Sequence, residues 1–165
     1  MTGSTDYLVR FATSNDEPFL WEMLYHAIFV PPGAAPVSRE MLHTTELARY
    51  VAGWGRADDI GLLAIDSRSQ YPMGAAWLRL LSGENQGYGY IDGDTPELSV
   101  AVLPEHRGRG VGSGLLTQLF REVQNRYKAI SLSVSENNPA VRLYERLGFS
   151  IVRKEGASMT MIRNS

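Results

Sequence analysis

The segment from residue 97 to residue 116 constrains the fold more than any other part of the chain. Its first six residues, Glu-Leu-Ser-Val-Ala-Val, alternate in polarity with the two-residue period of a β-strand that has one apolar face. Pro104 ends that pattern, and glycines follow at positions 108, 110, 112 and 114. Apolar residues then recur at helical spacing as far as Val123. This pattern predicts a strand, a glycine-rich turn and an amphipathic helix in direct succession.

Such a turn is suited to hold an anion. Glycines remove side chains that would keep a ligand away from the backbone, so the amides can close around an anion the size of a diphosphate. The first amides of the following helix have no partner within the helix, and the helix dipole adds positive charge at the same end. The alternative is that the glycines only make a tight connection between strand and helix.

Two well-known phosphate-binding patterns do not fit this turn. A P-loop requires Gly-Lys followed by Ser or Thr, and no lysine follows these glycines. In the dinucleotide-binding fingerprint, counted from Gly108, the second glycine is present at position 110 but the third position holds Ser113. What remains is Arg-Gly-Arg-Gly-Val-Gly at residues 107–112, which has the form Arg-x-x-Gly-x-Gly.

Size and charge set the outer limits. A chain of 165 residues with 44% hydrophobic content suits one domain, residues 1–165, with a real core. The absence of cysteine excludes disulfides and a cysteine nucleophile. A formal charge of −2 does not favour nucleic acid as a partner, so local groups must hold any anion. There is no apolar run of membrane-spanning length and no signal-peptide pattern at the N-terminus, so we expect a soluble cytoplasmic protein with no membrane partner.

The first half of the chain shows strand and helix signals of ordinary strength. A weakly alternating strand is predicted at 7–12. Ser14 and Glu17 have the spacing of a capping box at the start of a helix. The prolines within 29–36 must end that helix. A second helix is predicted at 38–50, with the serine at its start as the cap.

Two further strands are predicted at 60–65 and 73–81. Residues 82–96 are polar and rich in glycine, which indicates a long surface loop whose Tyr88 and Tyr90 either line a pocket or cover the sheet.

The second half continues with a strand at 130–134, parallel to the strand at 97–102 because a helix carries the chain back. Residues 137–140, Asn-Asn-Pro-Ala, begin a further helix that Gly148 ends. Two short strands, at 149–153 and 158–162, finish the chain as a hairpin. The order β-α-α-β-β-β-α-β-α-β-β indicates an α/β sheet of mixed direction with helices on both faces.

Two motifs in this order resemble those of the GNAT N-acetyltransferase superfamily. The first is the Arg-x-x-Gly-x-Gly turn at 107–112, and the second is Asn137-x-x-Ala140-x-x-x-Tyr144 continuing to Phe149. The resemblance covers residues 97–149. It implies a mixed, mostly antiparallel sheet of six to seven strands with a V-shaped splay between the central strands.

The resemblance also implies an acyltransferase that moves the acetyl group of acetyl-CoA, as cosubstrate, directly to a primary amine in a ternary complex. The acceptor would be a small molecule or a peptide, and the protein a monomer or homodimer. The alternative is a non-catalytic acyl-CoA-binding or sensor domain of the same fold. The residues expected to bind the cofactor are Val100, Ala101, Val102, Arg107, Gly108, Arg109, Gly110, Val111, Gly112, Ser113, Gly114 and Asn137. Among them, Val100 and Val102 would offer unpaired backbone groups to the pantetheine arm.

Acid and base candidates follow from the same chemistry. Tyr144 is expected to return a proton to the departing thiolate, because a phenol has a pKa of about 10 and a thiol about 8.5; otherwise it is a core tyrosine. Glu97 is the candidate base, acting through water. The alternatives are that Asp94 or a lowered pKa of the substrate amine takes its place, and that Glu97 is a solvated carboxylate at the start of a strand. Trp77 and Arg79 face either the acceptor or the core.

The three histidines, His26, His43 and His106, share no spacing typical of metal ligands, so no metal is expected.

Overall fold

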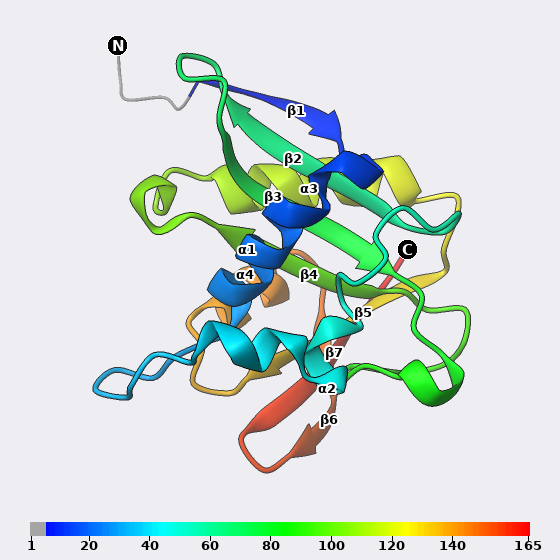
Figure 1. The fold of residues 1–165 in the computed structure, drawn as a ribbon. Helices are drawn as coiled ribbons and strands as arrows, with labels where there is room; N and C mark the ends of the chain where they lie inside the picture. Colours follow the sequence, from blue (N-terminus) through cyan, green and yellow to red (C-terminus); the bar gives the residue numbers. More distant parts are fainter. Residues whose placement is uncertain (1–5) are drawn as a thin grey trace.

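A seven-stranded sheet with helices on both faces dominates the computed structural model, which describes residues 6–165 (Figure 1). The strands are β1 (Tyr7–Phe11), β2 (Ile60–Asp66), β3 (Pro72–Arg79), β4 (Glu97–Val102), β5 (Ala129–Ser135), β6 (Ser150–Glu155) and β7 (Ser158–Asn164). The α-helices are α1 (Glu17–Ala27), α2 (Thr45–Ala48), α3 (Val111–Val123) and α4 (Ala140–Arg146). Short 3-10 helices are η1 (Ser14–Asp16), η2 (Arg39–His43), η3 (Gly83–Asn85) and η4 (Pro104–His106).

The strand order is β1-β2-β3-β4-β5-β7-β6. Within residues 6–165, neighbouring strands are antiparallel except β4 and β5, which are parallel because α3 carries the chain back between them. The expected mixed, mostly antiparallel sheet is confirmed. No helix in this part of the chain is long and apolar enough to cross a membrane.

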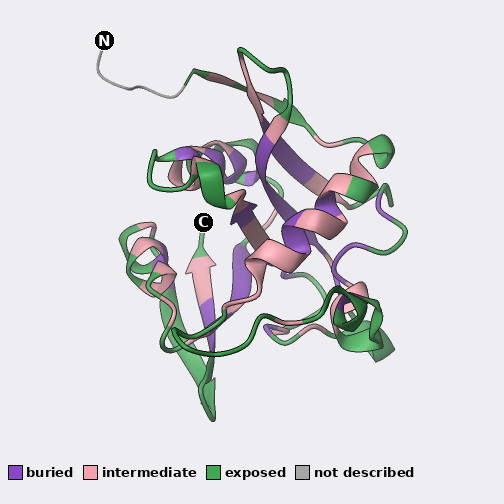
Figure 2. Ribbon diagram, turned by 60° about the vertical axis from the view of Figure 1, so that its left-hand side comes forward, coloured by how far each residue is buried: buried purple, intermediate pink, exposed green. Residues whose placement is uncertain are grey.

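Two apolar cores lie on opposite faces of the sheet. Strand alternation sends Ala76 and Leu78 of β3 to the core shared with α3 and α4, and Ala75 and Trp77 to the core shared with α1 and the η2–α2 segment. Buried residues gather on the middle strands, whereas β6 is exposed along its whole length (Figure 2). Helices therefore cover both faces of the central strands, and the sheet edge at β6 stands clear of them.

The predicted cap of the first helix is wrong by one residue. The capping box is formed by Thr13 and Asp16, and the residues between them make the 3-10 turn η1 before α1 begins. The Asp16 carboxylate accepts a 2.7 Å hydrogen bond from the Thr13 amide and two bonds from the Arg10 guanidinium. Asp16 serves better than Glu17 because one carboxylate both completes the capping box of η1 and pairs with Arg10 of β1.

The predicted helix at 38–50 is not one helix. It divides into η2 and α2 at Thr44, whose ψ angle of 152° is extended, and the Thr44 hydroxyl donates a 2.8 Å hydrogen bond to the Met41 carbonyl. Ser38 precedes η2 but makes no side-chain capping bond. Threonine competes with helical hydrogen bonding in this way, so the prediction from a serine cap overestimated the length of the helix.

Candidate active site

Strands β4 and β5 touch at one end only. Among the described residues, their single register pair joins Glu97 to Ser131, and the Ser131 amide donates a 3.0 Å hydrogen bond to the Pro96 carbonyl. Because backbone groups alternate between the two sides of a strand, those of Val100 and Val102 also face β5, beyond the point where the strands separate. The predicted V-shaped splay is present, and the edge of β4 is open toward it.

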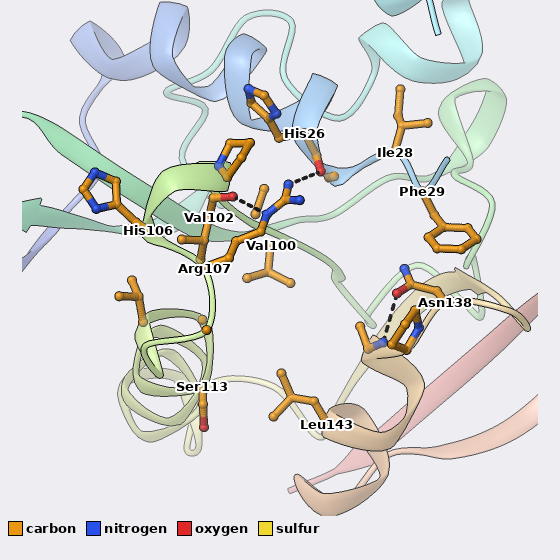
Figure 3. Close-up of a pocket in the computed structure, with 18 of the residues that line it drawn as sticks. His26, Ile28, Phe29, Val100, Val102, His106, Arg107, Ser113, Asn138 and Leu143 are labelled. Carbon is orange, nitrogen blue, oxygen red and sulfur yellow. Dashed lines mark hydrogen bonds between the residues drawn. The ribbon is translucent and has the colours of Figure 1, made fainter. Parts of the chain in front are cut away.

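A cavity of about 760 Å³ lies along this splay (Figure 3). Its walls are the end of α1 with the residues after it, β4, the glycine turn and the start of α4. The volume is within the range of about 300–1,000 Å³ that is usual for ligand sites. Most of the residues predicted to bind the cofactor line it: Val100, Ala101, Val102, Arg107, Gly108, Gly110, Val111, Gly112 and Ser113.

The turn before α3 makes one end of this cavity suitable for an anion. Gly108 and Gly110 have φ angles of +76° and +80°, in the left-handed region that residues with a side chain rarely adopt. Gly110 is the N-cap of α3 and has no side chain to occupy the first helical amides. These amides, at the positive end of a 13-residue helix, are therefore available to a ligand.

Three of the predicted cofactor residues do not line the cavity: Arg109, Gly114 and Asn137. Gly114 instead allows α3 to approach β1, since a Cβ added there would lie 2.3 Å from the Tyr7 hydroxyl oxygen. The neighbour of Asn137, Asn138, does line the cavity, and its Oδ1 accepts a 2.9 Å hydrogen bond from the Ala140 amide (Figure 3). The sequence motif thus places an asparagine at the cavity, one position later than expected.

The Arg107 side chain joins two walls of the cavity. Its Nε donates a 2.9 Å hydrogen bond to the Val102 carbonyl, and its Nη2 donates a 3.4 Å bond to the His26 carbonyl near the end of α1 (Figure 3). The carbonyl of Val102 was expected to be unpaired, and this expectation is wrong because the guanidinium occupies it. Val100 remains the open position on this edge of β4.

A second cavity, of about 300 Å³, adjoins the first. It is lined by α1 and the residues after it, by β4 and β5, and by the loop before β4. The residues shared by both cavities form the passage between them: Ala27, Ile28, Phe29, Val100, Asn138 and Tyr144. The two cavities are therefore two ends of one cleft.

Tyr144 of α4 lies at that passage. Its side chain is 9% exposed, and its ring packs edge-on against Phe149 with the ring centroids 5.9 Å apart. Burial raises the pKa of Tyr144 to about 12, so the phenol stays protonated at neutral pH. The hydroxyl can therefore act only as a proton donor or hydrogen-bond partner there, not as a base.

Glu97 lines the smaller cavity and is only 3% exposed, so its interpretation as a solvated carboxylate is wrong. Its Oε2 accepts a 2.6 Å hydrogen bond from the Tyr50 hydroxyl, whereas Oε1 has no hydrogen-bond partner among the described residues. Burial raises the pKa of the Glu97 carboxyl above its ordinary value, and the bond from Tyr50 is the largest effect that opposes this rise. The backbone amide of Gly89 also favours the ionised form of Glu97.

No sequence pattern points to Tyr50, which lies 47 residues before its partner Glu97. Its hydroxyl also accepts a 2.8 Å hydrogen bond from the Tyr88 amide, and its carbonyl accepts a 3.0 Å bond from the Trp77 indole. Burial, followed by the charge of Glu97, raises the pKa of Tyr50, so its hydroxyl remains a donor. Only the folded chain brings these groups together.

The structure decides the orientation of other candidates. Tyr88 lines the smaller cavity, which agrees with the first of its two predicted roles, lining a pocket rather than covering the sheet. Asp94, the alternative base, lines neither cavity. Trp77 and Arg79 face the core: both are almost fully buried, and Arg79 donates hydrogen bonds of 3.1 and 3.0 Å to the two carboxylate oxygens of Asp59. These two residues therefore support the fold rather than contact an acceptor.

His26 and His106 line the larger cavity. His26 lies 3.0 Å from a carboxylate oxygen of Glu22, one helical turn earlier. Within residues 6–165, no group of three or more His, Cys, Asp or Glu side chains is arranged to hold a metal ion.

The model of the acetyltransferase (GNAT) family matches residues 21–149. The chain belongs to the acetyltransferase (GNAT) family. This confirms the resemblance drawn from the glycine turn and the segment ending at Phe149, and it extends the match to α1.

Two curated relatives share part of the sequence of this GNAT chain. It is 36% identical over 83 residues to a mycothiol acetyltransferase of Corynebacterium aurimucosum, and 41% identical over 59 residues to an N-alpha-acetyltransferase of Saccharolobus solfataricus. The matches cover 49% and 34% of this chain. They span 25% and 35% of the lengths of those two proteins.

Solved structures share the fold over nearly the whole chain. The PaiA N-acetyltransferase of Thermoplasma acidophilum, in complex with coenzyme A, superposes with a TM-score of 0.67 at 16% identity, covering 97% of this chain and 99% of that one. The yncA structure from Salmonella typhimurium, with its cofactor acetyl-CoA, gives 0.62 at 22% identity and covers 97% and 94%. At these identities the likeness shows the GNAT fold.

Proposed function

We propose that this chain is an N-acetyltransferase that transfers the acetyl group of acetyl-CoA directly to a primary amine in a ternary complex. The observation that carries the proposal is the continuous cleft, with an amide-rich turn at one end, Tyr144 at the passage and Glu97 in the smaller cavity. Two distinct cavities that meet at one point suit two ligands bound together, which supports direct transfer without an enzyme-bound acetyl group.

The larger cavity is the proposed cofactor site. The amides of the glycine turn and the positive end of α3 would hold the pyrophosphate. The pantetheine arm carries amide groups that would pair with the open backbone edge of β4 at Val100, as an added strand would. The thioester would then lie at the passage, where a backbone amide of β4 can polarise its carbonyl. The structural relatives that hold coenzyme A or acetyl-CoA support this assignment.

The smaller cavity is the proposed acceptor site. An amine with a pKa near 10 is mostly protonated at neutral pH and must lose a proton before it attacks. Glu97 would accept that proton, directly or through water. The amine nitrogen then bonds to the acetyl carbon, the carbon–sulfur bond breaks, and the Tyr144 hydroxyl gives its proton to the thiolate. The second proton that leaves the attacking nitrogen restores the Tyr144 hydroxyl, and Glu97 releases the first proton to solvent. The products are the acetylated amine and CoA.

An amine panel tests the proposal. Purified protein is mixed with acetyl-CoA and a series of primary amines, and both thiol release and the mass of the acetylated product are measured. We expect release of CoA that depends on the amine and matches the amount of product. Tight binding of acetyl-CoA with no product from any amine would favour the alternative, a non-catalytic acyl-CoA sensor.

A further inference from the structure

The smaller cavity, called here the acceptor chamber, has one ionisable carboxylate and no basic side chain in the wall that the structure describes. Apart from Glu97, its lining residues carry apolar, hydroxyl or amide side chains. The Glu97 carboxylate is buried, and its Oε1 has no hydrogen-bond partner in the described chain. An ammonium ion entering the chamber would meet this carboxylate, because water does not screen a buried charge strongly.

The nearest basic groups lie outside the chamber and are already engaged. Arg49 and Arg153 both act on the charge of Glu97, but neither lines the chamber. The Arg49 guanidinium donates to two backbone carbonyl oxygens. The Arg153 guanidinium donates a 3.0 Å hydrogen bond to the Tyr90 carbonyl and a 3.2 Å bond to the Thr160 hydroxyl. An acidic group on an acceptor would therefore find no cationic partner in the chamber.

The remaining walls are uncharged. Leu24 and Leu47 form part of the apolar side that belongs to α1 and α2, while Ser133 and Ser135 of β5 present hydroxyl groups. The volume of about 300 Å³ corresponds to that of about ten water molecules in the liquid. The chamber thus has room for a short apolar substituent next to the amine.

We infer that the acceptor is a primary amine flanked by uncharged, apolar groups, and that free α-amino acids are poor acceptors. This inference rests on the proposed function, because it assigns the acceptor to the chamber that contains Glu97. The α-carboxylate of an amino acid would be buried beside the Glu97 carboxylate without a cationic partner. Its binding would be weakened because the carboxylate loses its hydration and because the two anions repel each other. An alkylamine or an amino-acid amide avoids both effects.

Three acceptors with the same branched side chain test this selectivity: 3-methylbutylamine, L-leucinamide and L-leucine. The kcat/KM for each is calculated on the concentration of its unprotonated amine, which removes differences in amine pKa. We expect L-leucine to be at least tenfold poorer than both of the others. Equal values for L-leucine and 3-methylbutylamine would overturn the inference.

A charge placed on the chamber wall tests the cause. Ser158 is an exposed residue that lines the chamber, so Ser158→Lys adds a cation there, whereas Ser150→Lys adds the same charge on exposed β6 away from the chamber. We expect Ser158→Lys to reduce the ratio of kcat/KM for 3-methylbutylamine to kcat/KM for L-leucine by at least threefold. Ser150→Lys should leave this ratio unchanged. A ratio that Ser158→Lys does not reduce, or that both variants reduce equally, would count against the electrostatic explanation.

Binding separates this inference from the proposed function. Absence of an acetylated product from all three amines would count against the proposed function only. Calorimetric titration of the three compounds into the CoA-bound protein would still test the selectivity of the acceptor chamber. Weaker binding of L-leucine than of 3-methylbutylamine would support the inference, and binding of equal strength would overturn it.

Discussion

The Tyr144 hydroxyl is the single group on which the proposed departure of the thiolate depends. Because its pKa is raised to about 12, it carries a proton across the whole physiological range. Removing that proton donor while keeping the ring should slow the chemical step and leave the packing against Phe149 intact.

We therefore expect Tyr144→Phe to lower kcat by about a hundredfold, the lower end of what general acid catalysis contributes. The affinity for CoA, measured by calorimetry, should change little. A variant that loses CoA binding instead would show that Tyr144 is a contact or packing residue.

Glu97 gives the reaction its expected pH dependence. A base works only when it is ionised, so kcat/KM should rise with pH through the pKa of Glu97, which burial raises above the ordinary value of a carboxyl. Glu97→Gln should lower kcat/KM by about a hundredfold and remove that rise. The measurement is a pH–rate profile for both proteins, and an unchanged profile in Glu97→Gln would exclude Glu97 as the base.

Tyr50 should affect the reaction through the pKa of Glu97, without exchanging a proton with the substrate amine. Its hydrogen bond favours the ionised form of Glu97, so its loss raises the pKa of Glu97 further. In Tyr50→Phe we expect the rising limb of the pH–rate profile to move to higher pH, with activity largely recovered on the alkaline side. A uniform loss of activity at every pH, with no shift of the limb, would mean that Tyr50 only supports the fold.

At the scale of elements, the contact of α3 with β1 is tight because residue 114 is glycine. A methyl group at this position would lie 2.3 Å from the Tyr7 hydroxyl oxygen, which is too close for two unbonded atoms. The rest of the Tyr7 ring is no nearer than 3.6 Å, an ordinary contact distance. The conflict therefore involves one oxygen atom, and removing that atom should relieve it.

We expect Gly114→Ala to lower the free energy of unfolding by about 1 kcal/mol, because the Tyr7 hydroxyl at the end of its side chain can shift and the helix preference of alanine offsets part of the overpacking. Combining it with Tyr7→Phe should restore stability or exceed that of Tyr7→Phe alone, since alanine favours a helix over glycine by about 1 kcal/mol. Denaturant unfolding of the two single variants and the double variant forms the test. If Gly114→Ala is stable beside an intact Tyr7, the close contact does not limit this position.

At the scale of the whole molecule, the sheet is two groups of strands that meet at a single register pair between β4 and β5. The proposed cofactor would lie at that opening, between β4 with the glycine turn on one side and the start of α4 on the other. A ligand that binds only the folded protein stabilises it by RT ln(1 + [L]/Kd), or about 2.7 kcal/mol at one hundred times its Kd.

For a chain of this size we expect CoA at that concentration to raise Tm by about 5–11 °C. Pantetheine, which lacks the pyrophosphate, should have a smaller effect at the same concentration because it leaves the glycine turn empty. Scanning calorimetry measures both. A Tm that CoA leaves unchanged, or that pantetheine raises equally, would contradict the assignment of the turn.

Sequence patterns that act over short distances determined much of this protein. Strand alternation at 97–102, the glycines before Val111 and the helical spacing after them all depend on neighbouring residues, so they predict β4, the turn and α3 correctly. The same local patterns placed Tyr144 on a helix near the proposed cofactor, and their order led to the GNAT family and its splayed sheet.

Tertiary structure alone decided what surrounds those elements. Burial of Glu97, its bond to Tyr50, and the approach of Gly114 to Tyr7 all join segments that lie far apart in the chain. So does the bond from Arg107 to the His26 carbonyl. No local pattern encodes such contacts, because desolvation and hydrogen bonding between distant residues exist only once the two faces of the sheet have been covered.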